Sequence, residues 1–151
     1  MDIIKEIEEW NRVRNNTEFN IELERRMLDE EVEEFITGLN MGDIVEMVDA
    51  YCDTYFVYIG SVYKSMNTLN KVHAELHYYY EAIDWMRGLL TDIDDDVLDM
   101  AMEYVITANK AKPIHKKEGK VIKGDDWVDP KIKIQEILEN YFTLTGGEIN
   151  V

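Results

Sequence analysis

The stretch from residue 44 to residue 63, IVEMVDAYCDTYFVYIGSVY, constrains the fold more than any other part of the chain. It is apolar on nearly every side, and a run of about twenty residues is typical of a buried helix rather than of a strand. Glu46, Asp49 and Asp53 interrupt it, and three carboxylates are too costly for a membrane span. We therefore expect a buried helix in a globular protein that has no membrane span.

Helical spacing of apolar residues recurs along the rest of the chain. It predicts helices over 2–15, 21–39, 70–90 and 97–109, and Pro130 is suited to open a last helix over 130–142. Residues 39–43 form a short turn with Asp43 as N-cap, so the helices on either side should be antiparallel. The 151 residues suit a single domain. We predict one all-α domain over 1–151, an antiparallel bundle of about five to six helices.

The formal net charge is −16, which argues against nucleic acid polymers and anionic membranes as partners. The charge is uneven, because residues 108–124 carry six lysines against one glutamate, a local charge of +5. We expect a basic loop over 109–130 on an acidic body. A solvated lysine-rich loop and a site for a small anion both remain open.

Carboxylates gather on two of the predicted helices. On a helical wheel of about 100° per residue, Glu31 and Glu34 lie about 60° apart, and Glu46, Asp49 and Asp53 share one face. Buried like charges raise one another's pKa and cost several kcal/mol per ion when nothing compensates them. Mg²⁺, or Mn²⁺ in its place, removes this cost and prefers hard oxygen ligands. We predict a metal site formed by Glu31, Glu34, Glu46 and Asp49, with Asp53 as a further ligand or a supporting group.

Other functions are compatible with parts of this sequence. An acidic helical interaction or regulatory protein without catalysis would also carry such charge, but mimicry of nucleic acid requires exposed carboxylates. A ferritin-like di-iron bundle requires Glu-x-x-His on two helices, and none of the three histidines has a glutamate three residues before it. The aromatic run HYYYEAIDWM over 77–86 suits base stacking as well as core or dimer packing.

The spacing Glu31-x-x-Glu34 followed by Glu46-x-x-Asp49 resembles the ExxE…ExxD signature of the all-α NTP pyrophosphohydrolases. This superfamily includes MazG-like enzymes, dimeric dUTPases and phosphoribosyl-ATP pyrophosphohydrolases. The string LDEEVEEF…GDIVEMVDAYCDTYFVYIG is most similar to the phosphoribosyl-ATP-pyrophosphohydrolase-like branch, which is often phage-encoded. NKAK at 109–112 and GKVIKGDDWVDPKI at 119–132 resemble the family's Asn-x-x-Lys element and its GKxxKG…P tail. The resemblance covers about residues 21–60 and 105–132, and the region 64–100 departs from it.

The resemblance implies Mg²⁺-dependent hydrolysis of an NTP or dNTP, expected to be a deoxynucleotide, to the monophosphate and pyrophosphate. It implies a homodimer or homotetramer. The single cysteine, Cys52, favours a reducing compartment, so we expect the cytoplasm, or the host cytoplasm for a phage protein. Glu30 is the candidate base, Asn109 is expected to bind sugar or phosphate, and the phosphates are assigned to Lys112, Lys120 and Lys123. Pyrimidine, purine and phosphoribosyl-ATP substrates all remain open.

Overall fold

The computed structural model describes residues 1–113, 116–117, 120–121, 123–124 and 127–145, with only the backbone described for 116–117 and 120–121. Its helices are α1 (Ile3–Val13), α2 (Ile21–Met41), α3 (Ile44–Leu69), α4 (Leu76–Leu89), α5 (Asp95–Lys110) and α6 (Lys131–Thr145). Two short strands, β1 (Lys116–Lys117) and β2 (Lys120–Val121), pair antiparallel within the predicted basic loop. The predicted all-α bundle is confirmed.

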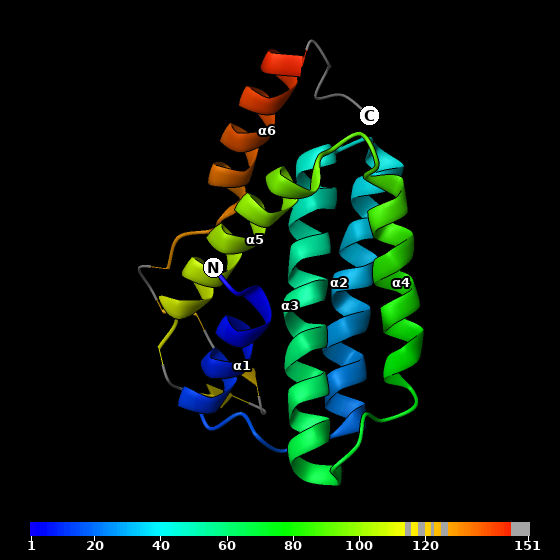
Figure 1. The fold of residues 1–151 in the computed structure, drawn as a ribbon, viewed down its shortest axis with the longest axis vertical. Helices are drawn as coiled ribbons and strands as arrows, with labels where there is room; N and C mark the ends of the chain where they lie inside the picture. The colour runs from blue at the N-terminus through cyan, green and yellow to red at the C-terminus, as the bar shows by residue number, and fades with distance from the viewer. Residues whose placement is uncertain (114–115, 118–119, 122, 125–126, 146–151) are drawn as a thin grey trace.

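Helix α3 is the centre of the molecule. In Figure 1, α2, α3 and α4 run side by side along the long axis. Helices α1, α5 and α6 lie on the side of α3 that faces away from α4. Each of the other five helices contacts α3. Its buried side chains include Met47, Val48 and Phe56, which belong to the main hydrophobic core. The predicted burial of the apolar run over 44–63 follows from this central position.

The connection between α2 and α3 has the predicted form. Asp43 is the N-cap of α3, and its Oδ1 accepts a hydrogen bond of 3.1 Å from the backbone N–H of Glu46. Gly42 ends α2 with φ of 66°, in the left-handed region that favours glycine. The tight turn makes α2 and α3 antiparallel neighbours. No described helix is both long and apolar enough to cross a membrane.

The boundaries between α3 and α4 differ from the prediction. Helix α3 continues to Leu69 instead of ending near residue 63, and α4 begins at Leu76 instead of residue 70. The first polar residues beyond residue 63, Lys64 and Ser65, are buried inside the protein. Ser65 Oγ donates to the backbone carbonyl of Lys71 at 2.6 Å and accepts from the N–H of His73 at 2.8 Å. Asn70, with φ of 57°, then ends the helix.

Candidate functional site

The register of α2 against α3 determines which carboxylates meet. The two helices approach closely where Gly38 lies against Glu46, since a Cβ on Gly38 would come 3.1 Å from the Cβ of Glu46. Seven residues back along α2 stands Glu31, and seven residues forward along α3 stands Asp53. Because the helices are antiparallel, Glu31 and Asp53 face each other about 10 Å farther from the turn.

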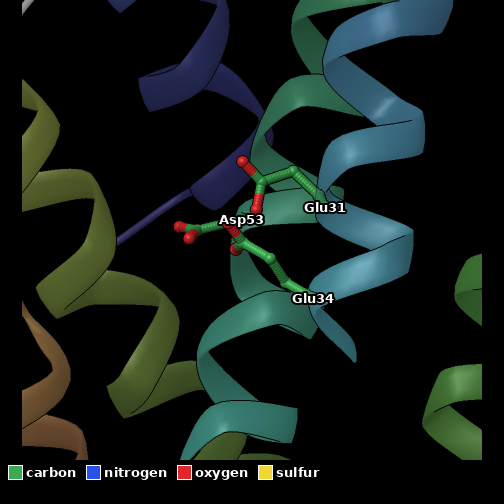
Figure 2. A group of neighbouring side chains, drawn as sticks. All are labelled: Glu31, Glu34 and Asp53. Carbon is green, nitrogen blue, oxygen red and sulfur yellow. The ribbon is translucent and has the colours of Figure 1, made fainter. Parts of the chain in front are cut away.

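Three of the five predicted metal ligands come together there. One carboxylate oxygen from each of Glu31, Glu34 and Asp53 lies within 4.8 Å of the other two. Figure 2 shows these side chains converging from α2 and α3. Glu31 and Asp53 are half-buried, and Glu34 is exposed. The donor set consists of hard carboxylate oxygens, so it fits Mg²⁺ or Mn²⁺ rather than a metal that prefers nitrogen or sulfur.

Asp49 lies one helical turn from Asp53 and is only 4% exposed. Its Oδ1 has no hydrogen-bond partner in the described part of the chain. Burial, followed by the charge of Asp53, raises the pKa of Asp49 to about 8. Burial and the neighbouring Glu31 raise the pKa of Asp53 well above its usual range. Several carboxylates therefore share a low-dielectric space that lacks enough positive charge, which is the condition that a divalent cation relieves.

Glu46 is placed differently from the other predicted ligands. Its Oε2 lies 2.7 Å from the Nζ of Lys131 at the start of α6, and it is not part of the three-carboxylate group. The close contact between Gly38 and Glu46 sets the register of α2 against α3, and in this register Glu34 meets Asp53.

A pocket of about 280 Å³ adjoins these carboxylates. It is lined by Glu30, Glu31, Glu34, Asp49 and Asp53, and by lysines 112, 123 and 131. Of the residues predicted to bind substrate, Asn109, Lys112 and Lys123 line it, and the side chain of Lys120 lies outside the described residues. Glu30, the candidate base, stands at its exposed edge. The structure thus brings acidic and basic groups to one cavity.

The lysine side of the pocket is built around Trp127. The ring centroid of Trp127 lies 4.5 Å from the Nζ of Lys123 and 5.3 Å from that of Lys112, within the range of cation–π attraction. The indole N–H of Trp127 donates to the backbone carbonyl of Ala108 at 2.8 Å. The aromatic ring therefore fixes two ammonium groups close to the end of α5.

The end of α5 is tied to α1 by hydrogen bonds. Arg14 donates to the backbone carbonyls of Asn109, Lys110 and Lys112 at 3.4, 3.1 and 3.0 Å. The indole N–H of Trp10 also donates to the carbonyl of Asn109, at 2.8 Å. These bonds satisfy the carbonyl groups that a helix end leaves without partners. They hold Asn109 and Lys112 at the pocket.

Several pocket residues were not predicted from the sequence. They are Trp10, Asn11, Asn16, Met27, Phe56, Val57, Gly60, Lys64, Trp127, Asp129, Pro130 and Lys131. The sequence contains a pattern that could have identified Lys64, because it continues the carboxylate face of α3 at helical spacing beyond Asp53. No such pattern exists for Trp10 and Asn11, since no local feature indicates which groove α1 covers.

The aromatic run over 77–86 does not line this pocket. Tyr78, Tyr80 and Trp85 are largely exposed on α4. The Oη of Tyr79 donates to Asp29 at 2.7 Å, and Trp85 packs edge-on against Phe35. These contacts favour the packing interpretation of the run over base stacking at this site.

Comparisons with known proteins place the chain in a family. Searches among curated proteins and among solved structures returned no match. The family model for phosphoribosyl-ATP pyrophosphohydrolase matches residues 3–79, which is half of the chain and contains α1, α2 and α3 with all the predicted carboxylates. Members of this family are divalent-metal-dependent enzymes within the MazG-like superfamily. The chain belongs to the phosphoribosyl-ATP pyrophosphohydrolase family of nucleotide pyrophosphohydrolases.

Proposed function

We propose that this protein is a Mg²⁺-dependent nucleoside triphosphate pyrophosphohydrolase. Its substrate is an NTP or dNTP, expected to be a deoxynucleotide, and its products are the monophosphate and pyrophosphate. One observation carries the proposal: the carboxylates of Glu31, Glu34 and Asp53 and the ammonium groups of Lys112 and Lys123 line the same pocket. A triphosphate with a bound divalent cation needs both kinds of group at once.

The residues divide into two roles in this proposal. Glu31, Glu34 and Asp53 hold the cation, and Asp49 and Glu46 complete its surroundings. A bound Mg²⁺ neutralises phosphate oxygens and helps to orient the attacking water. Glu30, at the rim of the pocket, is proposed to accept a proton from that water while the bond between the α- and β-phosphates breaks.

The positive groups of the pocket are proposed to bind the phosphates. Lys112 and Lys123 line it beside Trp127, and Lys120, whose side chain is not described, belongs to the same basic segment. The net charge of −16 repels an anionic substrate at long range. The lysines and the cation therefore have to act locally, where screening by salt is weakest.

The exposed apolar side chains of α4 favour an oligomer. Tyr78 is 65% exposed and Trp85 is 46% exposed, and such side chains on one surface are typical of an interface. We propose that a homodimer or homotetramer covers this surface, that the chain acts as one domain, and that it functions in the cytoplasm.

The deciding experiment measures pyrophosphate release from a panel of NTPs and dNTPs with Mg²⁺, with Mn²⁺ and with a chelator. Asp53→Asn should abolish the turnover of every nucleotide with either Mg²⁺ or Mn²⁺. Glu33→Gln is the matched control, because Glu33 is exposed on α2 between Glu31 and Glu34 and lies outside the pocket. An acidic interaction protein without catalysis would show no turnover of any nucleotide.

Thermal unfolding gives an independent test of the metal site. A ligand that binds only the folded state at a hundredfold excess over its Kd adds about 2.7 kcal/mol of stability. Mg²⁺ should therefore raise the melting temperature of the wild type and of Glu33→Gln, and a chelator should reverse the rise. The shift should be lost in Asp53→Asn. Equal shifts in all three proteins would refute the proposed ligands.

A further inference from the structure

The pocket extends well beyond the carboxylates. On α3 its wall continues from Asp53 through Val57 and Gly60 to Lys64, which share one helical face. Lys64 lies eleven positions beyond Asp53, which is about 16 Å along the helix axis. The far end of the pocket is therefore separate from the proposed metal and phosphate groups.

A buried ion pair stands at that far end. The Nζ of Lys64 lies 2.6 Å from Glu24 Oε1, and both side chains are buried, that of Glu24 completely. The hydroxyl of Ser61 donates to the same oxygen at 2.8 Å. Glu24 Oε2 has no hydrogen-bond partner among the residues that the structure describes. The described residues thus leave one oxygen of this ion pair without a hydrogen bond.

A contribution to stability does not by itself explain why this ion pair is buried. Removing two charges from water costs several kcal/mol per ion, and apolar replacements of buried pairs are often neutral or stabilising. Lys64 lines the pocket, and an ammonium group has three N–H donors, of which the described contacts use one. Donors remain for a ligand in the pocket.

An amide from α1 forms another part of the pocket wall, beside Gly60 of α3. Asn11 is 2% exposed, and its Nδ2 donates to the carbonyl of Ile7 at 2.8 Å, which fixes the orientation of the amide. Its Oδ1 accepts from Asn16 at 3.1 Å. A Cβ on Gly60 would lie 3.0 Å from Asn11 Nδ2, so glycine makes this approach possible. Met27, Phe56 and Val57 supply apolar surface beside these polar groups.

We propose that this end of the pocket binds the nucleobase, and that Lys64 selects bases with a carbonyl at C6 of a purine or C4 of a pyrimidine over bases with an amino group at that position. The inference rests on the proposed function. A nucleobase is a flat ligand with apolar faces and a polar edge, which suits apolar walls next to Lys64 and the two amides. An ammonium group only donates, so it binds a carbonyl oxygen and opposes an amino group. A donor that faces another donor loses its hydrogen bonds to water without replacement.

Matched pairs of nucleotides test this preference. dITP and dATP differ at C6, and dUTP and dCTP differ at C4, in each case by a carbonyl against an amino group. Non-hydrolysable α,β-imido forms of all four are titrated by calorimetry with Mg²⁺, beside inorganic tripolyphosphate, which has no base. In the wild type the carbonyl member of each pair should bind at least about tenfold tighter.

The test variant is Glu24→Gln combined with Lys64→Met, because this change leaves no unpaired buried charge. The preference within each pair should fall to about twofold or less, and the affinity for tripolyphosphate should persist and show that the protein is folded. Lys133→Met controls for the loss of one lysine, since Lys133 is exposed on α6. That variant should retain the wild-type preference.

The outcomes separate the two proposals. If tripolyphosphate binds but the wild type shows no preference within either pair, or the double variant keeps the preference, the inference about Lys64 is wrong and the proposed function stands. If neither the nucleotides nor tripolyphosphate bind with Mg²⁺, the proposed function fails and the inference fails with it.

Discussion

Glu46 and Lys131 form an ion pair that joins the start of α3 to the start of α6, with 2.7 Å between Oε2 and Nζ. The hydrogen bond that Lys131 donates to Glu46 is the main reason that the pKa of Lys131 is raised. Lys131 also lowers the pKa of the neighbouring Asp49, against the stronger effect of burial. A lysine of α6 therefore supplies part of the positive charge that the carboxylates of α3 need. In the proposed site, Lys131 competes with the metal for Glu46.

Replacing Lys131 should therefore strengthen metal binding. In Lys131→Met we expect the Mg²⁺ affinity to rise by about three- to tenfold, or roughly 0.7–1.4 kcal/mol, because Glu46 becomes available and a nearby cation is gone. Calorimetric titration of the nucleotide-free protein measures this. Lys133→Met is the control, since Lys133 pairs with Glu136 on the exposed side of α6. Equal Mg²⁺ affinities in the wild type and Lys131→Met would show that Glu46 and Lys131 play no part in metal binding.

The pH dependence of stability tests the burial of Asp49. Its pKa in the folded protein is about 8, against about 3.9 in an unfolded chain. A carboxyl whose pKa is raised by folding stabilises the protein fully below its unfolded pKa, and this stabilisation is lost as the pH rises through the folded value. Without metal, the free energy of unfolding should therefore fall between pH 4 and pH 8, because Asp49 ionises less readily in the folded protein than in the unfolded chain.

Asp49→Asn removes the titration and nearly keeps the shape of the side chain. Its stability in chelator should equal that of the wild type near pH 4 and exceed it increasingly up to pH 8. Urea denaturation at several pH values gives the difference between the two proteins. A constant difference across this range would mean that Asp49 ionises freely in the folded state.

The buried ion pair between Glu24 and Lys64 leads to a separate prediction about the free energy of unfolding. Lys64→Met leaves Glu24 charged in a fully buried position and should cost about 3–5 kcal/mol of unfolding free energy. In the Glu24→Gln background the same substitution should lower the unfolding free energy much less, since no buried charge is left without a partner. The two substitutions are compared by urea denaturation in a double-mutant cycle. Equal costs in both backgrounds would contradict a buried, interacting pair.

Much of the fold was predictable because it rests on local patterns. The apolar run over 44–63 predicted a buried helix, and Asp43 was predicted as the cap of α3, because periodicity and capping depend only on neighbouring residues. The end of α3 was less predictable. Lys64 and Ser65 look like surface residues in the sequence, and only their partners, Glu24 and the loop after Asn70, keep them inside a continuing helix.

The candidate site was likewise predictable only in the parts that depend on local spacing. Spacing placed Glu31 and Glu34 on one face of α2, but the register that sets Asp53 against them depends on how closely Gly38 approaches Glu46. That approach is a property of tertiary packing and has no signature in spacing. The parts of the pocket from α1 and α6, such as Asn11 and Lys131, were also beyond prediction, because they reach the site only when distant segments fold together.

The close contact at Gly60 can be tested against a glycine that has no such contact. Gly88 lies on the exposed side of α4, and a Cβ there would meet nothing within 4 Å. Gly88→Ala should therefore raise the unfolding free energy by about 0.5–1 kcal/mol, the usual gain of alanine over glycine in a helix.

Gly60→Ala has the same intrinsic gain, but its Cβ would lie 3.0 Å from the Nδ2 of Asn11. The amide would have to shift by a few tenths of an ångström, which strains its buried hydrogen bond to the carbonyl of Ile7, and such a bond contributes about 0.5–1.5 kcal/mol. We expect no net gain in stability by urea denaturation. We also expect a weaker affinity for deoxynucleotide analogues but not for tripolyphosphate, because Asn11 lies at the proposed base end of the pocket. If Gly60→Ala is stabilised as much as Gly88→Ala and binds the analogues like the wild type, the approach of Asn11 to α3 has no role in binding.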